Sequence, residues 1–141
     1  MSVVLDCSAT MPWCFEDEAN ADADDLLTDI ATRGAIVPEL WFLEVANVLF
    51  QAEKRGRIAI AKVETILDLL ASLPIRAEPG DGFEVWRHIL PLARQTGLTI
   101  YDATYLDLAR RHGLPLATLD GELAKAARQI GVATLLARPT G

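Results

Sequence analysis

Residues 114–137 read LPLATLDGELAKAARQIGVATLLA. A short apolar run ends at Asp120, a helical stretch follows and stops at Gly131, and a second apolar run covers 132–137. Two buried strands separated by one helix are typical of a parallel sheet, because parallel strands need a long crossover connection. This stretch therefore predicts an α/β fold.

The rest of the chain shows the same alternation of short apolar runs and helical stretches. Further strands are predicted at 2–6, 35–38 and 73–78, and further helices at 20–33, 39–55, 59–72, 83–97 and 100–112. Pro91 is expected to kink or restart the helix in which it lies. The 141 residues contain no repeat or linker, so we expect one domain built on a parallel sheet.

The charge of the chain is unevenly distributed. The net charge of -7 argues at first against a nucleic-acid partner. However, residues 1–32 carry eight acids and no Lys or Arg, whereas residues 33–141 carry thirteen basic and twelve acidic residues. The acidity is therefore local, and the balanced remainder is compatible with binding a nucleic acid.

Several classes of protein are disfavoured by missing patterns. No apolar run is long enough for a membrane span, and no basic stretch precedes the first apolar run, so neither a membrane protein nor a secretion signal is expected. Cys7 and Cys14 lack metal-binding or CxxC spacing, which favours a cytoplasmic protein with free thiols. Nucleotide-binding glycine motifs are absent from the sequence, so no nucleotide cofactor is predicted.

Three carboxylates stand where predicted elements begin or end. Asp6 and Asp120 follow predicted strands, and Asp102 lies at the start of a predicted helix. Ligands of parallel sheets bind at the carboxyl ends of the strands. Each acid also has a structural alternative: Asp6 and Asp120 fit turn or helix-capping positions, and Thr99 with Asp102 fits a capping box. Thr118 alternates with Asp120 and is expected to point the same way.

A fourth carboxylate, Glu44, lies in the apolar stretch LWFLEVANVLF (40–50). With Asn47 and Gln51 it forms a narrow polar stripe on a predicted helix. A buried carboxylate is costly unless it is paired or bound to a metal. The structural alternative is a hydrogen bond from Asn47 inside the core, and we favour a functional role.

Convergence of these four acids would favour a divalent cation. Neighbouring carboxylates raise one another's pKa values unless cations keep them ionised, and oxygen-only sites suit Mg²⁺ or Mn²⁺. The two histidines, His88 and His112, lie next to arginines in predicted helices and offer no zinc site. The sequence therefore predicts an Mg²⁺ or Mn²⁺ cofactor.

Four segments together resemble a known family. They are LDCS (5–8), LEVANVL (43–49), GLTIYDATYLDLA (97–109) and LATLDGEL (116–123). This pattern resembles the PIN-domain ribonucleases, particularly the VapC-type toxins of bacterial toxin–antitoxin pairs. The resemblance spans essentially the whole chain. It implies a single PIN domain over 1–141, with a three-layer α/β/α sandwich around a central parallel sheet of about five strands.

The resemblance also assigns roles to residues. It implies catalytic acids at Asp6, Glu44, Asp102 and Asp120, metal ligation by Asp6 and Asp102, and polar support from Ser8, Asn47 and Thr118. There are two small departures from the family pattern. Cys7 stands where alanine is more usual, and Asp107 is an additional acid that we expect on the solvent side of its helix.

The implied function is metal-dependent endoribonuclease activity, in which metal-activated water hydrolyses RNA phosphodiester bonds. The implied partners are RNA, a VapB-like antitoxin and a second copy of the chain, without a membrane. Two alternatives stay open: a PIN nuclease for housekeeping RNA processing, and a non-catalytic module that binds RNA or a partner. The large rings (Trp13, Phe15, Trp41, Phe42, Phe50 and Trp86) fit either interfaces or a core.

Overall fold

Five short parallel strands form the central sheet of the protein, in a computed structural model that describes residues 2–137. The strands are β1 (Val3–Leu5), β2 (Ala35–Pro38), β3 (Ile75–Glu78), β4 (Leu116–Thr118) and β5 (Thr134–Leu136). Their order is β3-β2-β1-β4-β5. In register, Val4 of β1 lies opposite Ile36 on one side and Leu116 on the other. The predicted parallel sheet of about five strands is confirmed.

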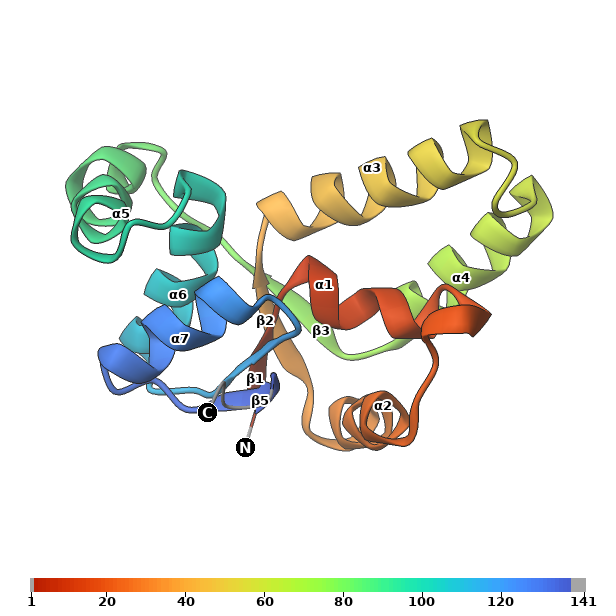
Figure 1. Cartoon of the computed structure of the whole chain (residues 1–141), viewed down its shortest axis with the longest axis horizontal. Coiled ribbons are helices and arrows are strands. Elements are labelled where there is room, and N and C mark those ends of the chain that lie inside the picture. Colours follow the sequence, from red (N-terminus) through yellow and green to blue (C-terminus); the bar gives the residue numbers. More distant parts are fainter. Residues whose placement is uncertain (1, 138–141) are drawn as a thin grey trace.

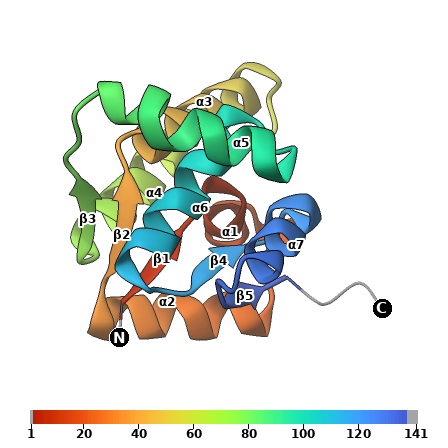
Figure 2. The ribbon, with the colours of Figure 1, turned by 90° about the vertical axis from the view of Figure 1, so that its left-hand side faces the viewer.

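Helices cover both faces of this sheet. They are α1 (Cys7–Thr10), α2 (Ala21–Arg33), α3 (Leu40–Lys54), α4 (Ile60–Ser72), α5 (Leu90–Thr96), α6 (Ile100–His112) and α7 (Gly121–Gln129). Figure 1 shows α1 to α4 on one side of the sheet and α5 to α7 on the other, and Figure 2 shows the second group from the front. The fold is therefore the expected α/β/α sandwich.

The central strands are apolar along their whole length because both of their faces are covered. All three residues of β1 and all three of β4 are buried, and so are the four residues of β2. The edge strands β3 and β5 are only partly buried. One hydrophobic core surrounds the sheet and includes Leu49 from one helical layer and Leu106 from the other.

The stretch 83–97 differs from a regular helix. It begins with a π-helical turn, η3 (Val85–Ile89), and continues as α5, with Pro91 in the first turn of that helix. Proline is tolerated there because the first amides of a helix have no intrahelical partner. Pro91 thus restarts the helix, as predicted. The short helix α1 was not predicted, because four residues are too few for a periodic pattern.

The strand order reverses at β1, so the switch point of the sheet lies at the carboxyl ends of β1 and β4. From β1 the sheet grows through β2 to β3 on one side, and through β4 to β5 on the other. Such a switch point is where open α/β sheets bind ligands. Within residues 2–137, no helix is long and apolar enough to cross a membrane.

Candidate active site

Asp6 lies at the carboxyl end of β1 and is held by three hydrogen bonds. It is 4% exposed, and its Oδ1 accepts from the Ser8 hydroxyl at 2.7 Å and from the Ala9 amide at 2.9 Å. Its Oδ2 accepts from the Thr118 hydroxyl at 2.6 Å. The Ala9 bond makes Asp6 the N-cap of α1, so the capping alternative is also realised. A carboxylate oxygen has two lone pairs, so Oδ2 keeps one acceptor direction.

Burial raises the pKa of Asp6 above its ordinary value. The bonds from Thr118, Ser8 and Ala9 act in the opposite direction, and the charge of Asp120 raises the pKa further. The effect of burial on the pKa outweighs that of the three hydrogen bonds, so these bonds do not fully stabilise the ionised form of Asp6. A cation would supply the remaining stabilisation.

Asp120 is the N-cap of α7, next to Asp6. Its Oδ1 accepts from the amides of Glu122 at 2.9 Å and Leu123 at 3.1 Å. Its own amide donates to the Thr118 hydroxyl at 3.0 Å. Thr118, which is fully buried, therefore links the two strand-end acids directly.

Asp102 reaches the same place from the first turn of α6. The helix begins at Thr99, whose hydroxyl accepts from the Asp102 amide at 3.1 Å. Asp102 is half-buried, and burial raises its pKa to about 6, with further contributions from the charges of Asp120, Asp6 and Glu44. Asp102 therefore experiences the charges of the other three predicted acids. Asp6 and Asp120 are linked through Thr118, and the charges of Asp6, Asp120 and Glu44 all raise the pKa of Asp102. We call Asp6, Glu44, Asp102 and Asp120 the four-acid cluster.

Glu44 enters the four-acid cluster from α3 and is held by a residue of α6. The Tyr105 hydroxyl donates a hydrogen bond to Glu44 Oε1 at 2.5 Å. Burial, and then the bond to Glu44, raises the pKa of Tyr105 above its ordinary value. Tyr105 is consequently a neutral donor. Tyr105 was not predicted as a site residue, although its spacing of three from Asp102 puts both on one side of α6.

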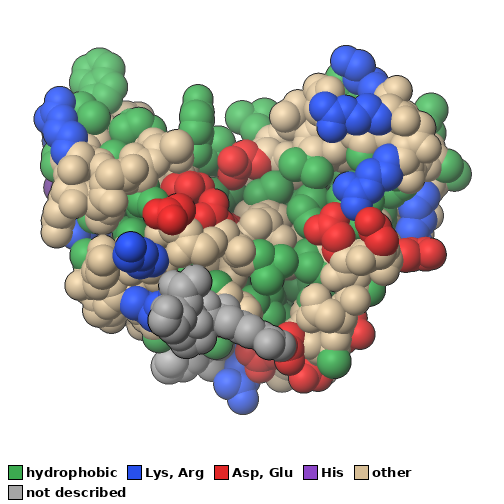
Figure 3. Space-filling model, in the orientation of Figure 1, with side chains coloured by type: hydrophobic (Ala, Val, Ile, Leu, Met, Phe, Trp, Pro, Cys, Tyr) green, Lys and Arg blue, Asp and Glu red, His purple; other side chains and the backbone are tan. Residues whose placement is uncertain are grey.

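The surface of the molecule is hollowed on one face. Figure 3 shows the molecule hollowed between the lobe of α5 and α6 and the lobe of α3 and α4, with acidic side chains gathered there.

A family model for the PIN domain matches residues 3–129 of the chain. The chain belongs to the PIN domain family. It is 29% identical over 125 residues to Ribonuclease VapC3 of Pyrobaculum aerophilum, covering 89% of this chain and 94% of that protein. It is 36% identical over 101 residues to Exonuclease VapC9 of the same organism, covering 70% of this chain and 72% of that protein.

A solved structure supports the fold of this PIN domain. The crystal structure of PAE2754 from Pyrobaculum aerophilum superposes with a TM-score of 0.71 at 24% identity, covering 95% of this chain and 83% of that chain. This likeness concerns the fold alone.

One predicted polar neighbour of Glu44, Asn47, is placed differently from expectation. Asn47 is exposed, and no hydrogen bond joins it to Glu44, both residues being described. The alternative of a core hydrogen bond between them is therefore wrong: Tyr105, from another helix, provides the donor. Cys7 is half-buried near the cluster, and burial, with Glu44 and Asp6 nearby, raises the pKa of its thiol to about 12. Cys7 is thus an unreactive neighbour of this PIN domain's acids.

The prediction that Asp107 faces solvent is wrong. Asp107 is 3% exposed. It accepts from Arg111 Nε at 2.8 Å and from Arg110 at 3.3 Å. Helix α6 packs against both the sheet and its neighbouring helices, so little of its middle is left for solvent, and the two arginines compensate the buried charge.

The donor chemistry of the four-acid cluster fits Mg²⁺ or Mn²⁺, whose preferred ligands are carboxylate oxygens. As placed in residues 2–137, however, no three Asp, Glu, His or Cys side chains form a ready ligand set for one ion. Mg²⁺ commonly binds through one or two carboxylates and keeps several waters. A site of that kind fits this PIN domain better than an all-protein cage.

Proposed function

We propose that this PIN domain is an Mg²⁺- or Mn²⁺-dependent endoribonuclease, the toxin of a toxin–antitoxin pair acting in the cytoplasm. The proposal is supported by the link between Asp6 and Asp120 through the Thr118 hydroxyl, and by the charges of Asp6, Glu44 and Asp120 that raise the pKa of Asp102. The similarity to proteins named Ribonuclease VapC3 and Exonuclease VapC9 supports the reaction class.

In this proposal Asp6 and Asp102 hold the ion. Asp6 is fixed by its three hydrogen bonds and keeps an acceptor direction on Oδ2. Asp102 has a pKa near 6, so it is largely ionised at neutral pH. When bound, a divalent ion supplies a water of lowered pKa and offsets negative charge developing on the phosphate.

Glu44 and Asp120 are the candidates to accept the proton from the attacking water. Tyr105 fixes Glu44 through Oε1, which leaves Oε2 as an acceptor. Asp120 uses Oδ1 to cap α7, which leaves Oδ2. Either carboxylate is held by a buried residue or a helix start, as a general base requires.

We expect RNA cleavage to depend on a metal ion because of the negative charge of the four acids. Four carboxylates in one cluster repel the phosphates of RNA, and partial burial strengthens this repulsion by lowering the local dielectric constant. Substrate can approach only after a cation has offset the charge. We therefore expect no cleavage by the metal-free protein.

An exonuclease is the second candidate, because the relative with 36% identity is named an exonuclease. Circular RNA separates the two activities, since it has no ends. An endonuclease cleaves circular and linear RNA of the same sequence, whereas an exonuclease degrades only the linear form. The proposal expects cleavage of both.

The proposed protein partners are a VapB-like antitoxin and a second copy of the chain. Of the six large rings singled out in the sequence, Phe15 and Trp41 belong to the core, whereas Phe42, Phe50 and Trp86 are exposed by 49%, 54% and 68%. Exposed aromatic rings are enriched at interfaces. An antitoxin-like reading frame next to this one would separate a toxin from a housekeeping PIN nuclease.

The test is to express the wild type and Asp6→Ala in cells and to map RNA 5′ ends. New ends that appear with the wild type alone would support the proposal and identify the target. Identical end profiles, with toxicity retained by Asp6→Ala, would overturn it in favour of the non-catalytic module.

A further inference from the structure

A cavity of about 600 Å³ lies beside the four-acid cluster, at the ends of β2 and β3 rather than those of β1 and β4. Pro38 and Glu78, the last residues of these two strands, line it. Helix α6 forms one wall with Tyr101, Thr104 and Leu108, at the spacing i, i+3 and i+7 of a single stripe. None of the four cluster acids lines this cavity, so it is a separate site.

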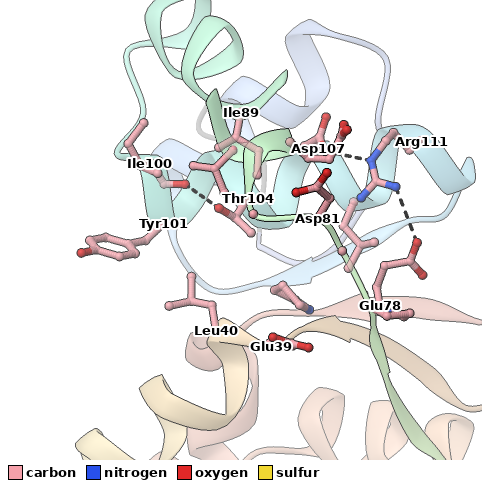
Figure 4. A pocket seen from close by; sticks show the side chains of 17 residues that line it. Glu39, Leu40, Glu78, Asp81, Ile89, Ile100, Tyr101, Thr104, Asp107 and Arg111 are labelled. Atoms are coloured by element: carbon pink, nitrogen blue, oxygen red, sulfur yellow. Dashed lines mark hydrogen bonds and ion pairs between the residues drawn. The ribbon is translucent and has the colours of Figure 1, made fainter. Parts of the chain in front are cut away.

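The interior of the cavity is apolar. Ile89 and Leu108 are buried, and Leu40, Val85 and Ile100 are half-buried where they line it. Figure 4 shows Leu40, Ile89 and Ile100 coming to the cavity from three different segments of the chain. A ligand with a hydrocarbon portion would bury apolar surface here.

The rim of the cavity is strongly acidic. Five carboxylates and one guanidinium line it: Glu39, Glu78, Asp81, Glu84, Asp107 and Arg111. The single cation is already engaged, because Arg111 donates to Asp107 at 2.8 Å and lies 3.6 Å from Glu78 (Figure 4).

Two of these carboxylates, Glu39 and Asp81, have no cationic partner among residues 2–137. Glu84 lies 2.8 Å from His88, and Glu78 lies 3.1 Å from His112. By contrast, no Lys, Arg or His of residues 2–137 lies within ion-pair distance of Glu39 or Asp81. Figure 4 shows these two acids entering from different segments, Glu39 at the start of α3 and Asp81 in the loop after β3.

An apolar interior with unpaired acids at its rim selects a cation on a hydrocarbon stem. RNA is disfavoured, because its phosphates would meet carboxylates. A second copy docked through the same face in a twofold contact would bring two acidic rims together. Arginine and lysine side chains, by contrast, combine an apolar stem with a charged end.

We propose that this cavity binds an arginine or lysine side chain of a partner polypeptide, with the stem on Leu40 and Ile100 and the charge between Glu39 and Asp81. The occupant is a basic segment flanked by apolar residues. The contact lies outside the four-acid cluster, and it does not depend on whether the protein cleaves RNA.

The probe is the acetylated, amidated peptide Leu-Arg-Leu, titrated into ¹⁵N-labelled protein in the presence of Mg²⁺, which competes for the cluster acids. Leu-citrulline-Leu is the matched control, since citrulline has nearly the shape of arginine without its charge.

The test variant is Glu39→Gln with Asp81→Asn. Asparagine keeps the acceptor that Asp81 offers to the Phe83 amide at 3.0 Å, so the loop should persist. The control variant, Glu64→Gln with Asp68→Asn on exposed α4 positions, changes the net charge equally.

The proposal expects amide shifts confined to residues 39–40, 78–85 and 100–108. It also expects the citrulline peptide to bind the wild type at least about tenfold more weakly than the arginine peptide does. The test variant should bind the arginine peptide at least about tenfold more weakly than the wild type, and the control variant should bind it as the wild type does. A tenfold change is about the effect of one charge-assisted hydrogen bond. Equal binding of both peptides, or shifts centred on Asp6 and Asp120, would overturn it. Shifts of the same residues caused by single-stranded RNA, or by raising the protein concentration alone, would also overturn it by identifying another occupant.

Discussion

The Tyr105 hydroxyl donates a hydrogen bond to Glu44 across 61 positions of sequence and joins α6 to α3. Tyr105 is 2% exposed, so its ring cannot move without disturbing the core. The bond gives Glu44 a partner among the apolar residues of α3, and it fixes the orientation of this carboxylate.

Tyr105→Phe is expected to lower kcat for RNA cleavage about tenfold with little change in KM. The ring stays in the core, but Glu44 loses the donor that orients it, and one hydrogen bond to a charged group accounts for roughly 1.5–3 kcal/mol. Steady-state kinetics on a fluorogenic RNA measures the effect.

Tyr101→Phe is the matched control for that experiment, because Tyr101 lies four residues earlier on the same helix and is exposed. A Tyr105→Phe enzyme with wild-type kcat would show that the bond has no role in positioning Glu44. A Tyr105→Phe variant that loses activity and also has a lowered unfolding midpoint would instead indicate a purely structural role.

Asp102→Asn is expected to stabilise the metal-free protein at pH 8 by about 1 kcal/mol while abolishing cleavage. The pKa of Asp102 rises from 3.8 to about 6, so the folded state binds a proton more tightly than the unfolded state. The cost of ionising Asp102 is therefore complete above about pH 6 and disappears as the pH falls through about 4. Two pKa units correspond to about 3 kcal/mol, reduced here because Asp102 is half-exposed.

Urea unfolding with EDTA at pH 8 and at pH 4 measures this difference. The stabilising effect should be present at pH 8 and should shrink toward zero at pH 4. A variant that is less stable than the wild type at pH 8 would show that Asp102 is not electrostatically strained.

Asp107→Asn is expected to act in the opposite direction and destabilise the protein by about 1–2 kcal/mol at neutral pH. It removes the charge that pairs with Arg110 and Arg111 and replaces one of the two acceptor oxygens by an amide donor, while the arginines can rehydrate because they are partly exposed. Urea unfolding at pH 7 checks it. Unchanged stability would mean that the ion pairs of Asp107 contribute nothing.

Thr118→Val is expected to cost about 1–3 kcal/mol of stability and to weaken Mg²⁺ binding. Valine fills the same space but removes the donor to Asp6 and the acceptor for the Asp120 amide. Calorimetric titration with Mg²⁺ and thermal unfolding measure the two effects. Thr65→Val is the control, since the Thr65 hydroxyl bonds only the Ala61 carbonyl on exposed α4. Equal Mg²⁺ affinity in Thr118→Val and wild type would contradict the supporting role.

Local pattern predicted much of the fold because strand and helix periodicities are short-range properties. The strand at 35–38 and the helix at 100–112 have the predicted bounds, and the other elements differ at their ends by a few residues. The acids at Asp6 and Asp120 were readable because the ends of parallel strands meet at one edge. Asp6 and Asp120 each cap a helix and also belong to the four-acid cluster, so the structural and the functional alternatives do not exclude each other.

Contacts between distant elements could not be read from local pattern. The partner of Glu44 is Tyr105 rather than nearby Asn47, and that choice depends on how α3 and α6 pack on opposite layers. Asp107 looked solvent-facing because an acid on a helix usually is, and its two arginines are visible only once α6 is placed. The acidic cavity likewise joins three separate segments.

The most direct test of the central claim, that the four acids form a cation-dependent hydrolytic site, is cleavage of circular RNA by purified protein. Wild type and Asp6→Asn are compared with Mn²⁺ and with EDTA, after circular dichroism has shown both to be folded. The account predicts cleavage by the wild type with Mn²⁺ and none in the other three conditions. Cleavage by the wild type in EDTA, or by Asp6→Asn at the wild-type rate, would contradict it.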